Sequence, residues 1–260
     1  MIKLDLAKVE FSKKDKWFNI KLPTLLTLKL AYETGVHIGD GSLPLFKSRP
    51  NIYRIYYSGN SLNEMPFFRS VLKPLIKELY NKNVKVIKRR KNECSIEFGS
   101  KAIFTFKNKV LGLPIGHKDR ISIPSIILQD KKLMLNCLRG IADTDFSLAF
   151  LKKYKDVHYY PKIKGDSKSK LLIKQIEEIT KKVLHVNPVV SCDVERYDKR
   201  TGKTSIINTI ELNGRKCLKV WMKKVGFSNM EHITKFLVWK RLGYVPKLSI
   251  NEKIELIETT

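Results

Sequence analysis

The chain has 260 residues, of which 43% are hydrophobic and 10% aromatic, and this composition excludes a globally disordered protein. Lys and Arg total 51 against 25 Asp and Glu, which gives a net charge of +26 and indicates a polyanionic partner. The basic residues are spread along the whole chain and do not flank one amphipathic segment, so nucleic acid is favoured over a membrane surface.

The sequence carries no membrane, secretion or cross-linking signal. No apolar run reaches the roughly 18 residues of a bilayer-spanning helix. The charged start MIKLDLAKVEFSKKDKW does not form a signal peptide. The four cysteines lie far apart without a C-x-x-C pair, so neither a zinc site nor a disulfide framework is expected. We therefore expect a cytoplasmic protein with no membrane partner.

The first half of the chain begins with an expected N-terminal appendage at residues 1–20. A helix is predicted to end at Gly39-Asp40-Gly41, because apolar and small residues repeat at helical spacing up to that point. The apolar residues of 67–80 also keep helical spacing. Residues 84–98 alternate apolar and charged side chains and predict half-buried strands, and an amphipathic run at 98–114 closes this half.

The second half repeats this order. The stretch LRGIADTDFSL (138–148) again places an acid at the end of a helical run, and residues 170–184 keep helical spacing. Residues 189–212 predict strands with a hairpin tip at YDKRTGK, followed by another amphipathic run. The sequence therefore predicts two duplicated α+β halves with pseudo-twofold symmetry, at residues 21–125 and 126–260.

Asp40 and Asp145 are the candidate catalytic residues of the two duplicated halves. Each follows a helix with small residues four apart, starting at Gly35 and Gly140, and such spacing lets two helix backbones approach closely. If the helices pack side by side, their ends bring the two acids together, where a hard divalent cation offsets the charge of both carboxylates and both helix ends. Gly-Asp-Gly alone is a common helix stop. The repeated acid on a strongly basic chain is what indicates a shared site.

Five stretches together resemble a known family. AYETGVHIGDG (31–41) and LRGIADTDF (138–146) resemble the two motifs of the LAGLIDADG homing endonucleases, in the single-chain, double-motif form. IKLPTLLTLKLA (20–31), LGLPIGHKDRISIPSI (111–126) and GRKCLKVWMKKVGFSN (214–229) resemble archaeal and intein-associated members. Intein splicing is not expected, because the terminal residues that it needs are missing. The resemblance implies αββαββα-type halves with two antiparallel β-sheet saddles around a central two-helix interface.

The resemblance also implies a reaction and a site. It implies hydrolysis of both DNA strands at a long asymmetric target, leaving short 3′ overhangs, by a monomer with two or more Mg²⁺ ions that Mn²⁺ can replace. Asp40 and Asp145 would bind the metals, beside Gly39 and Thr144. Lys118 matches the basic residue between the motifs, although composition alone is equally consistent with a solvated loop lysine. In the second half, either Lys235 or His232 could take that role.

Three positions depart from the family pattern. Phe146 stands where glycine usually follows the second acid, and phenylalanine does not easily adopt a positive φ, so we expect a different backbone around Asp145. Glu33 and His37 replace apolar residues of the first motif, and His37 is expected to be an interface histidine and not a metal ligand. Asp143 matches the first aspartate of the family motif and is expected to have a structural role.

The predicted sheets supply the DNA-binding candidates, although strand register decides which of them face the groove. Lys and Arg there would bind phosphates, and Arg would also read base edges. The candidates are Arg49, Tyr53, Arg54, Tyr56, Lys85, Lys88, Arg89 and Arg90 in the first half, and Lys162, Lys164, Lys168, Arg196, Lys199, Arg200 and Lys203 in the second.

Two alternatives to a double-strand DNA endonuclease stay open at the level of sequence. One is a maturase that binds intron RNA through the same basic surface, and the other is a DNA-binding protein that has lost cleavage. Both acids are present, which favours the endonuclease, whereas Phe146 favours the inactive protein. If the gene lies in an intron of an organelle, an organellar location is expected instead of the cytoplasm.

Overall fold

The computed structural model describes residues 2–46, 48, 51–89, 92–198 and 202–259. The chain forms two compact units, Met1–Thr144 and Asp145–Thr260. The repeat predicted from the sequence divides at residues 125/126 instead, and that boundary stays a prediction. No helix in the described ranges is long and apolar enough to cross a bilayer.

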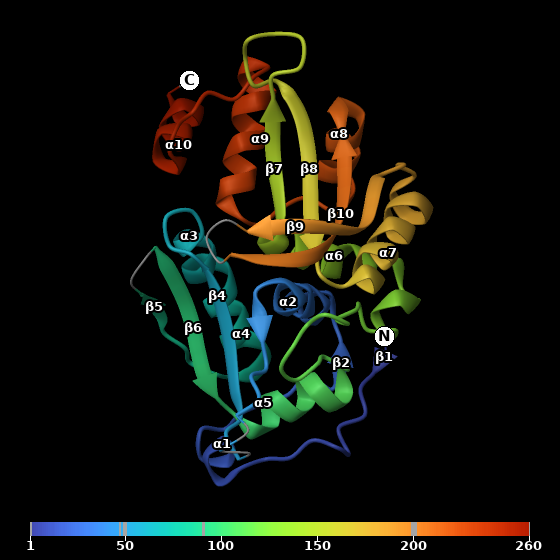
Figure 1. Cartoon of the computed structure of the whole chain (residues 1–260). Coiled ribbons are helices and arrows are strands. Elements are labelled where there is room, and N and C mark those ends of the chain that lie inside the picture. Colours follow the sequence, from blue (N-terminus) through green and yellow to red (C-terminus); the bar gives the residue numbers. More distant parts are fainter. Residues whose placement is uncertain (1, 47, 49–50, 90–91, 199–201, 260) are drawn as a thin grey trace. The chain divides into compact units, whose positions relative to one another are not determined.

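The first unit is built around a four-stranded antiparallel sheet with the spatial order β3-β4-β6-β5 (Figure 1). These strands are β3 (Gly41–Ser42), β4 (Arg54–Asn60), β5 (Val86–Lys88) and β6 (Glu93–Gly99). The α-helices are α1 (Lys13–Trp17), α2 (Leu28–Gly39), α3 (Met65–Phe67), α4 (Lys73–Tyr80), α5 (Lys101–Thr105) and α6 (Lys131–Asp145), whose last residue belongs to the second unit. Shorter helical turns are Phe68–Leu72, Phe106–Val110 and Ile127–Gln129.

The expected N-terminal appendage packs on the first unit. Strand β1 (Ile2–Lys3) pairs antiparallel with β2 (Leu25–Leu26), just before α2. Farther along, the buried Asp15 accepts hydrogen bonds from the Ser100 hydroxyl (2.7 Å) and the Ala102 amide (3.2 Å). The appendage therefore ties the starts of α2 and α5 into one core.

The second unit has a sheet with the spatial order β7-β8-β10-β9, again antiparallel throughout (Figure 1). Its strands are β7 (Phe146–Leu151), β8 (Tyr160–Ser167), β9 (Val189–Asp198) and β10 (Lys203–Asn213). Its α-helices are α7 (Lys170–Ile179), which the turn Thr180–Leu184 extends, α8 (Gly214–Lys224), α9 (Met230–Leu242) and α10 (Ile250–Glu258).

The two sheets confirm the duplication that the order of elements predicts. In each half a long helix leads into two strands, a helical segment, two more strands and a further helix, which is the αββαββα order. In both sheets the four strands are arranged as first, second, fourth and third. Because this crossover order is the same twice in one chain, the halves are repeats of one fold.

The alternating side chains of the strands explain why each sheet has one buried and one open face. In β8, Pro161, Ile163 and Gly165 are buried, while the intervening residues are half-exposed. Helices cover the apolar face, and in Figure 1 α8 and α9 lie beside the strands of the second sheet. The opposite face of each sheet carries mostly polar and charged side chains.

Helices α2 and α6 cross at two glycines within the first unit. A Cβ atom on Gly35 would overlap the Cys137 carbonyl oxygen and lie 3.0 Å from the Ile141 amide nitrogen. A Cβ atom on Gly140 would overlap the Tyr32 carbonyl oxygen and lie 2.7 Å from the Val36 nitrogen. Backbone therefore meets backbone on both sides, and only glycine leaves room for it. The close helix approach predicted from the small residues is confirmed.

Candidate functional site

The first candidate acid, Asp40, is the C-cap residue of α2 and is half-buried. Its amide donates to the Val36 carbonyl (3.0 Å), which completes the last helical turn, and its carbonyl accepts from the Ser58 amide on β4 (3.3 Å). The next residue, Gly41, starts β3 opposite Tyr57. The acid is therefore held between the end of the motif helix and the first strand pair of the sheet.

Lys118 lies at the same helix end. Its ammonium donates hydrogen bonds to the carbonyls of Ile38 (2.8 Å), Gly39 and Gly41 (3.1 Å), which flank the candidate acid. A cation there also opposes the negative end of the α2 dipole. Lys118 is therefore not a solvated loop lysine, and this part of the chain gathers main-chain oxygens around a positive charge.

The two departures in the first motif, Glu33 and His37, are both buried on α2. Burial lowers the pKa of His37 well below its usual value, and the charges of Lys107 and Lys118 add to the effect, so the imidazole is neutral. The Glu33 carboxylate forms a buried ion pair with the Lys107 ammonium (2.6 Å) and accepts from two tyrosines. Sequence reasoning noticed these residues only as departures and did not find their partners.

The second candidate acid, Asp145, is the last residue of α6. Two residues earlier, the buried Asp143 accepts a hydrogen bond from the Tyr32 hydroxyl (2.6 Å), which links α6 to α2 inside the first unit. This contact agrees with the structural role expected for Asp143. The Thr144 hydroxyl donates to the Gly140 and Ile141 carbonyls of its own helix, at 3.1 and 3.0 Å.

Phe146 does not create the backbone problem expected from the sequence. Gly41, the corresponding residue after the first acid, has no positive φ among the described residues, so glycine is not required there for its backbone conformation. Gly41 pairs with the large Tyr57, whereas Phe146 pairs with Gly165. A Cβ atom on Gly165 would overlap the Phe146 ring. Each half thus pairs one small and one large residue, on opposite strands.

The chemistry of the α2 end suits a hard divalent cation. The oxygen donors at this end are the Asp40 carboxylate and main-chain carbonyls that also accept from Lys118, and oxygen donors are the ligands that Mg²⁺ and Ca²⁺ prefer. Within the described ranges no group of three or more His, Cys, Asp or Glu residues could hold a metal by itself. A Mg²⁺ ion commonly takes one or two carboxylates and completes its shell with water and substrate phosphate. The residues present therefore fit a divalent metal ion only if water or a phosphate completes its shell.

The open face of the first sheet carries a cluster organised by Glu97. The Glu97 carboxylate accepts from Arg89 (2.9 Å) and from the Tyr56 hydroxyl (2.8 Å), and it pairs with Arg54. Arg89 also donates to the Ser95 hydroxyl (3.0 Å). Three predicted DNA-binding residues are thus brought together on one face and oriented by a single acid.

The second sheet has a similar cluster around Asp166. Arg196 donates to Asp166 (2.9 Å) and to the Thr209 hydroxyl (2.9 Å), and Lys164 lies 3.5 Å from the same carboxylate. Burial would raise the pKa of Asp166, but hydrogen bonds from Thr209 and Arg196 outweigh it and lower that pKa. On the same face, Lys162 pairs with Glu211 at 2.7 Å. The register therefore places Lys162, Lys164 and Arg196 on one open face.

The other DNA-binding candidates are more scattered. Tyr53 precedes β4, and its ring packs edge-on against Phe104, 5.4 Å between centroids. Lys88 pairs with the buried Cys94 and so belongs to the opposite face of the sheet from Arg89. Lys85, Lys168 and Lys203 are exposed. Four candidates lie outside the described residues, namely Arg49, Arg90, Lys199 and Arg200.

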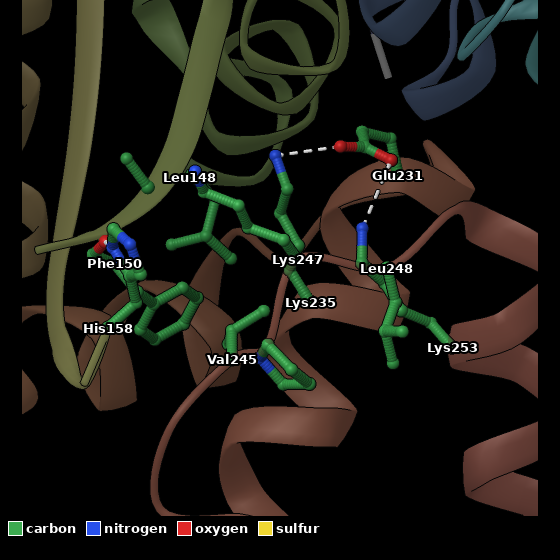
Figure 2. A pocket seen from close by; sticks show the side chains of 11 residues that line it. Leu148, Phe150, His158, Glu231, Lys235, Val245, Lys247, Leu248 and Lys253 are labelled. Atoms are coloured by element: carbon green, nitrogen blue, oxygen red, sulfur yellow. Dashed lines mark hydrogen bonds and ion pairs between the residues drawn. The ribbon is translucent and has the colours of Figure 1, made fainter.

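The two alternative basic residues of the second unit have different surroundings. Burial lowers the pKa of His232 to about 3, and its ring packs against Phe227 with 4.6 Å between centroids. Lys235 lines a cavity of about 390 Å³ and pairs with Glu231 at 2.7 Å (Figure 2). Glu231 also lies 3.7 Å from the buried Lys253. His232 is therefore a neutral core residue, and Lys235 belongs to an ion-pair cluster of α9 and α10.

Solved structures share this architecture, although no family model and no curated protein matches the chain in sequence. Mesophilic variants of the homing endonuclease I-DmoI have a TM-score of 0.51 and 16% identity, covering 76% of this chain and 94% of theirs. I-DmoI in complex with DNA and Mn gives 0.50 and 17%, covering 76% and 96%. The complex with DNA and Ca gives 0.50 and 17%, covering 76% and 88%. The chain thus has the homing-endonuclease fold that its motifs imply.

Proposed function

We propose that this protein is a site-specific double-strand DNA endonuclease that uses divalent metal ions. The observation that carries the proposal is the pair of acids at equivalent places. Asp40 and Asp145 each lie at the end of a helix, and the two helices cross at Gly35 and Gly140, five residues before the respective acid. The net charge of +26 and the fold of I-DmoI, which has been solved with DNA and Mn, support a nucleic-acid substrate.

In this proposal each of the two acids contributes a carboxylate to metal binding. The Asp40 and Asp145 carboxylates hold Mg²⁺ or Mn²⁺, with main-chain oxygens of Gly39 and Thr144 beside them. A metal ion held by these residues would supply Lewis-acid chemistry, which lowers the pKa of bound water and stabilises the leaving oxygen of a phosphodiester. Lys118 keeps its ammonium at the end of α2, where it places positive charge beside the phosphate and orients the backbone on both sides of Asp40.

The open sheet faces bind the duplex. Arg54 and Arg89 on the first sheet, and Lys164 and Arg196 on the second, exchange part of their pairing with Glu97 and Asp166 for DNA phosphates and base edges. The acids restrict the side-chain conformations of the cations before binding, which reduces the entropy lost on complex formation. Because one chain contains both halves, a monomer covers a long asymmetric target.

The test is cleavage of a randomised duplex library, with the new ends sequenced. Wild type, Asp40→Asn and Asp145→Asn are incubated with Mg²⁺, Mn²⁺ or Ca²⁺. Asp156→Asn, which changes an exposed acid paired with Lys152, is the matched control. We expect discrete cut sites for wild type and the control in Mg²⁺, with none for the two Asn variants, which still bind the selected DNA. Binding without cleavage by wild type would refute the proposal, and intron RNA would then be the next ligand.

A further inference from the structure

A buried network of polar side chains in the first unit links the interior of the core to the end of α2. Glu33 and Lys107 have no exposed side-chain surface, and Lys107 donates to both carboxylate oxygens at 2.6 and 2.8 Å. Tyr57 donates to one of these oxygens, and Tyr80 donates to the other at 2.8 Å. The carboxylate thus accepts four hydrogen bonds, which is about its full capacity. The cleavage chemistry proposed above uses none of these residues.

The same hydrogen-bond network determines the tautomer of His37. Burial, together with the nearby charge of Glu33, raises the pKa of Tyr57 well above its usual value, so the phenol keeps its proton. That single proton is donated to Glu33, and the Tyr57 oxygen can only accept from the His37 Nδ1 atom, 3.3 Å away. His37 is therefore the Nδ1–H tautomer, and Tyr57 holds its ring edge-on at 5.4 Å between centroids.

His37 in turn occupies the space beside the backbone that follows Asp40. A Cβ atom on Gly41 would lie 2.5 Å from the His37 Cγ atom, so the imidazole and the Gly41 backbone are in close contact. Tyr57 is also the strand partner of Gly41, and the next residue, Ser58, donates to the Asp40 carbonyl. The ring and the strand pair thus support the acid from two sides.

We propose that Tyr57 and His37 are positioning residues for Asp40, and that the hydrogen bond from His37 Nδ1 to the Tyr57 hydroxyl orients the backbone at Asp40 and Gly41. This inference rests on the proposed metal-dependent cleavage. Glu33 and Lys107 are its buried anchor, because they fix the direction of the Tyr57 proton. His37 does not bind the metal in this arrangement, and its effect reaches Asp40 through packing against Gly41.

The two tyrosines of this network, Tyr57 and Tyr80, form a matched pair for the test. Tyr57→Phe and Tyr80→Phe each remove one buried hydroxyl and one hydrogen bond to Glu33, and both leave the aromatic ring in place. Only Tyr57 contacts His37. A purely structural network predicts similar effects of the two substitutions, whereas a positioning role predicts an effect of Tyr57→Phe alone.

The experiment uses the 260-residue protein and measures two things separately. One is the conformation at His37 and Gly41, and the other is the rate of DNA cleavage. Nitrogen-15 NMR of labelled histidine, assigned with His37→Gln, reports the tautomer of His37, and the amide resonance of Gly41 reports the adjacent backbone. Single-turnover cleavage of the selected DNA target is then followed against Mg²⁺ concentration. Target affinity is measured in Ca²⁺, in which binding and cleavage can be separated.

We expect the Nδ1–H tautomer in wild type and Tyr80→Phe, and a mixture of tautomers with a shifted Gly41 amide in Tyr57→Phe. We also expect Tyr57→Phe to lower the rate at saturating DNA about tenfold and to raise the Mg²⁺ midpoint, with DNA affinity retained. Equal effects of the two variants, or an Nε2–H tautomer in wild type, would overturn the inference. Absence of cleavage by wild type would overturn the proposed function instead, while the NMR comparison still decides whether Tyr57 orients His37 and Gly41.

Discussion

The buried ion pair between Glu33 and Lys107 makes the stability of the first unit sensitive to a single side chain. In Lys107→Met the aliphatic volume is largely kept, but the Glu33 carboxylate loses two hydrogen bonds and its only paired cation within the described core. Removing one partner of a buried pair typically costs about 3–5 kcal/mol. Since domains are stable by only about 5–15 kcal/mol, we expect the first unit to lose about a fifth or more of its stability.

A second substitution separates loss of charge balance from loss of packing. In Lys107→Met/Glu33→Gln no charge is left, and the Gln carbonyl accepts from either Tyr57 or Tyr80 but leaves the other phenol less well satisfied. An unsatisfied buried group costs about 1–3 kcal/mol, so the double variant should be more stable than Lys107→Met alone. The two changes would then be coupled, with the second partly reversing the first.

Amide hydrogen exchange resolves the effect by unit. The protection of β4, which carries Tyr57, should fall in Lys107→Met and partly recover in the double variant, while β8 of the second unit is the internal reference. Urea unfolding followed by circular dichroism gives the free energies. A cost below about 1 kcal/mol for Lys107→Met, or a double variant less stable than the single one, would refute this account of the buried pair.

Three further outcomes are expected. Gly140→Ala should destabilise the protein by at least about 2 kcal/mol in urea unfolding, because the new Cβ atom meets the Tyr32 backbone, whereas Gly99→Ala meets nothing closer than 3.6 Å and should be mild. Burial lowers the pKa of His232 to about 3, so only the unfolded state gains this proton as the pH falls below about 6.5, and stability should drop by about 1.4 kcal/mol per pH unit. His232→Asn should lower the slope between pH 6 and 5 by about 1.4 kcal/mol per pH unit and leave the contribution of the other buried histidine, His37. Arg54→Gln should reduce the slope of log affinity against log salt by about one in DNA-binding titrations, and an unchanged slope would mean that Arg54 makes no phosphate contact.

The order of elements could be predicted from the sequence because it is encoded locally. Helical spacing at 67–80 and 170–184, and alternation in the strands, are properties of neighbouring residues, and both were confirmed apart from a π-helical turn in each helical segment. The close crossing of α2 and α6 was also predictable, since Gly35 and Gly140 have few other uses inside a helix.

The surroundings of the candidate site could not be predicted, because they depend on residues distant in sequence. Lys107 lies 74 positions from Glu33, and Lys118 lies 79 positions from Gly39, so nothing in the local pattern indicates either contact. Strand register likewise decides that Arg89 faces the Glu97 cluster while Lys88 does not. The expectation at Phe146 assumed that glycine follows the acid because a positive φ is needed there, but neither Gly41 nor Phe146 has a positive φ.

The strand pair next to each acid has one small and one large residue, but on opposite strands in the two halves. This difference limits how freely the halves can be recombined. A chimeric protein that joins a first half to another first half would need Gly41 and Tyr57 to travel together, and one built from second halves would need Phe146 with Gly165. Transplanting only the motif helix and its following residue would place two large rings, or two glycines, across one strand pair. The natural unit of exchange is therefore the helix with its first hairpin.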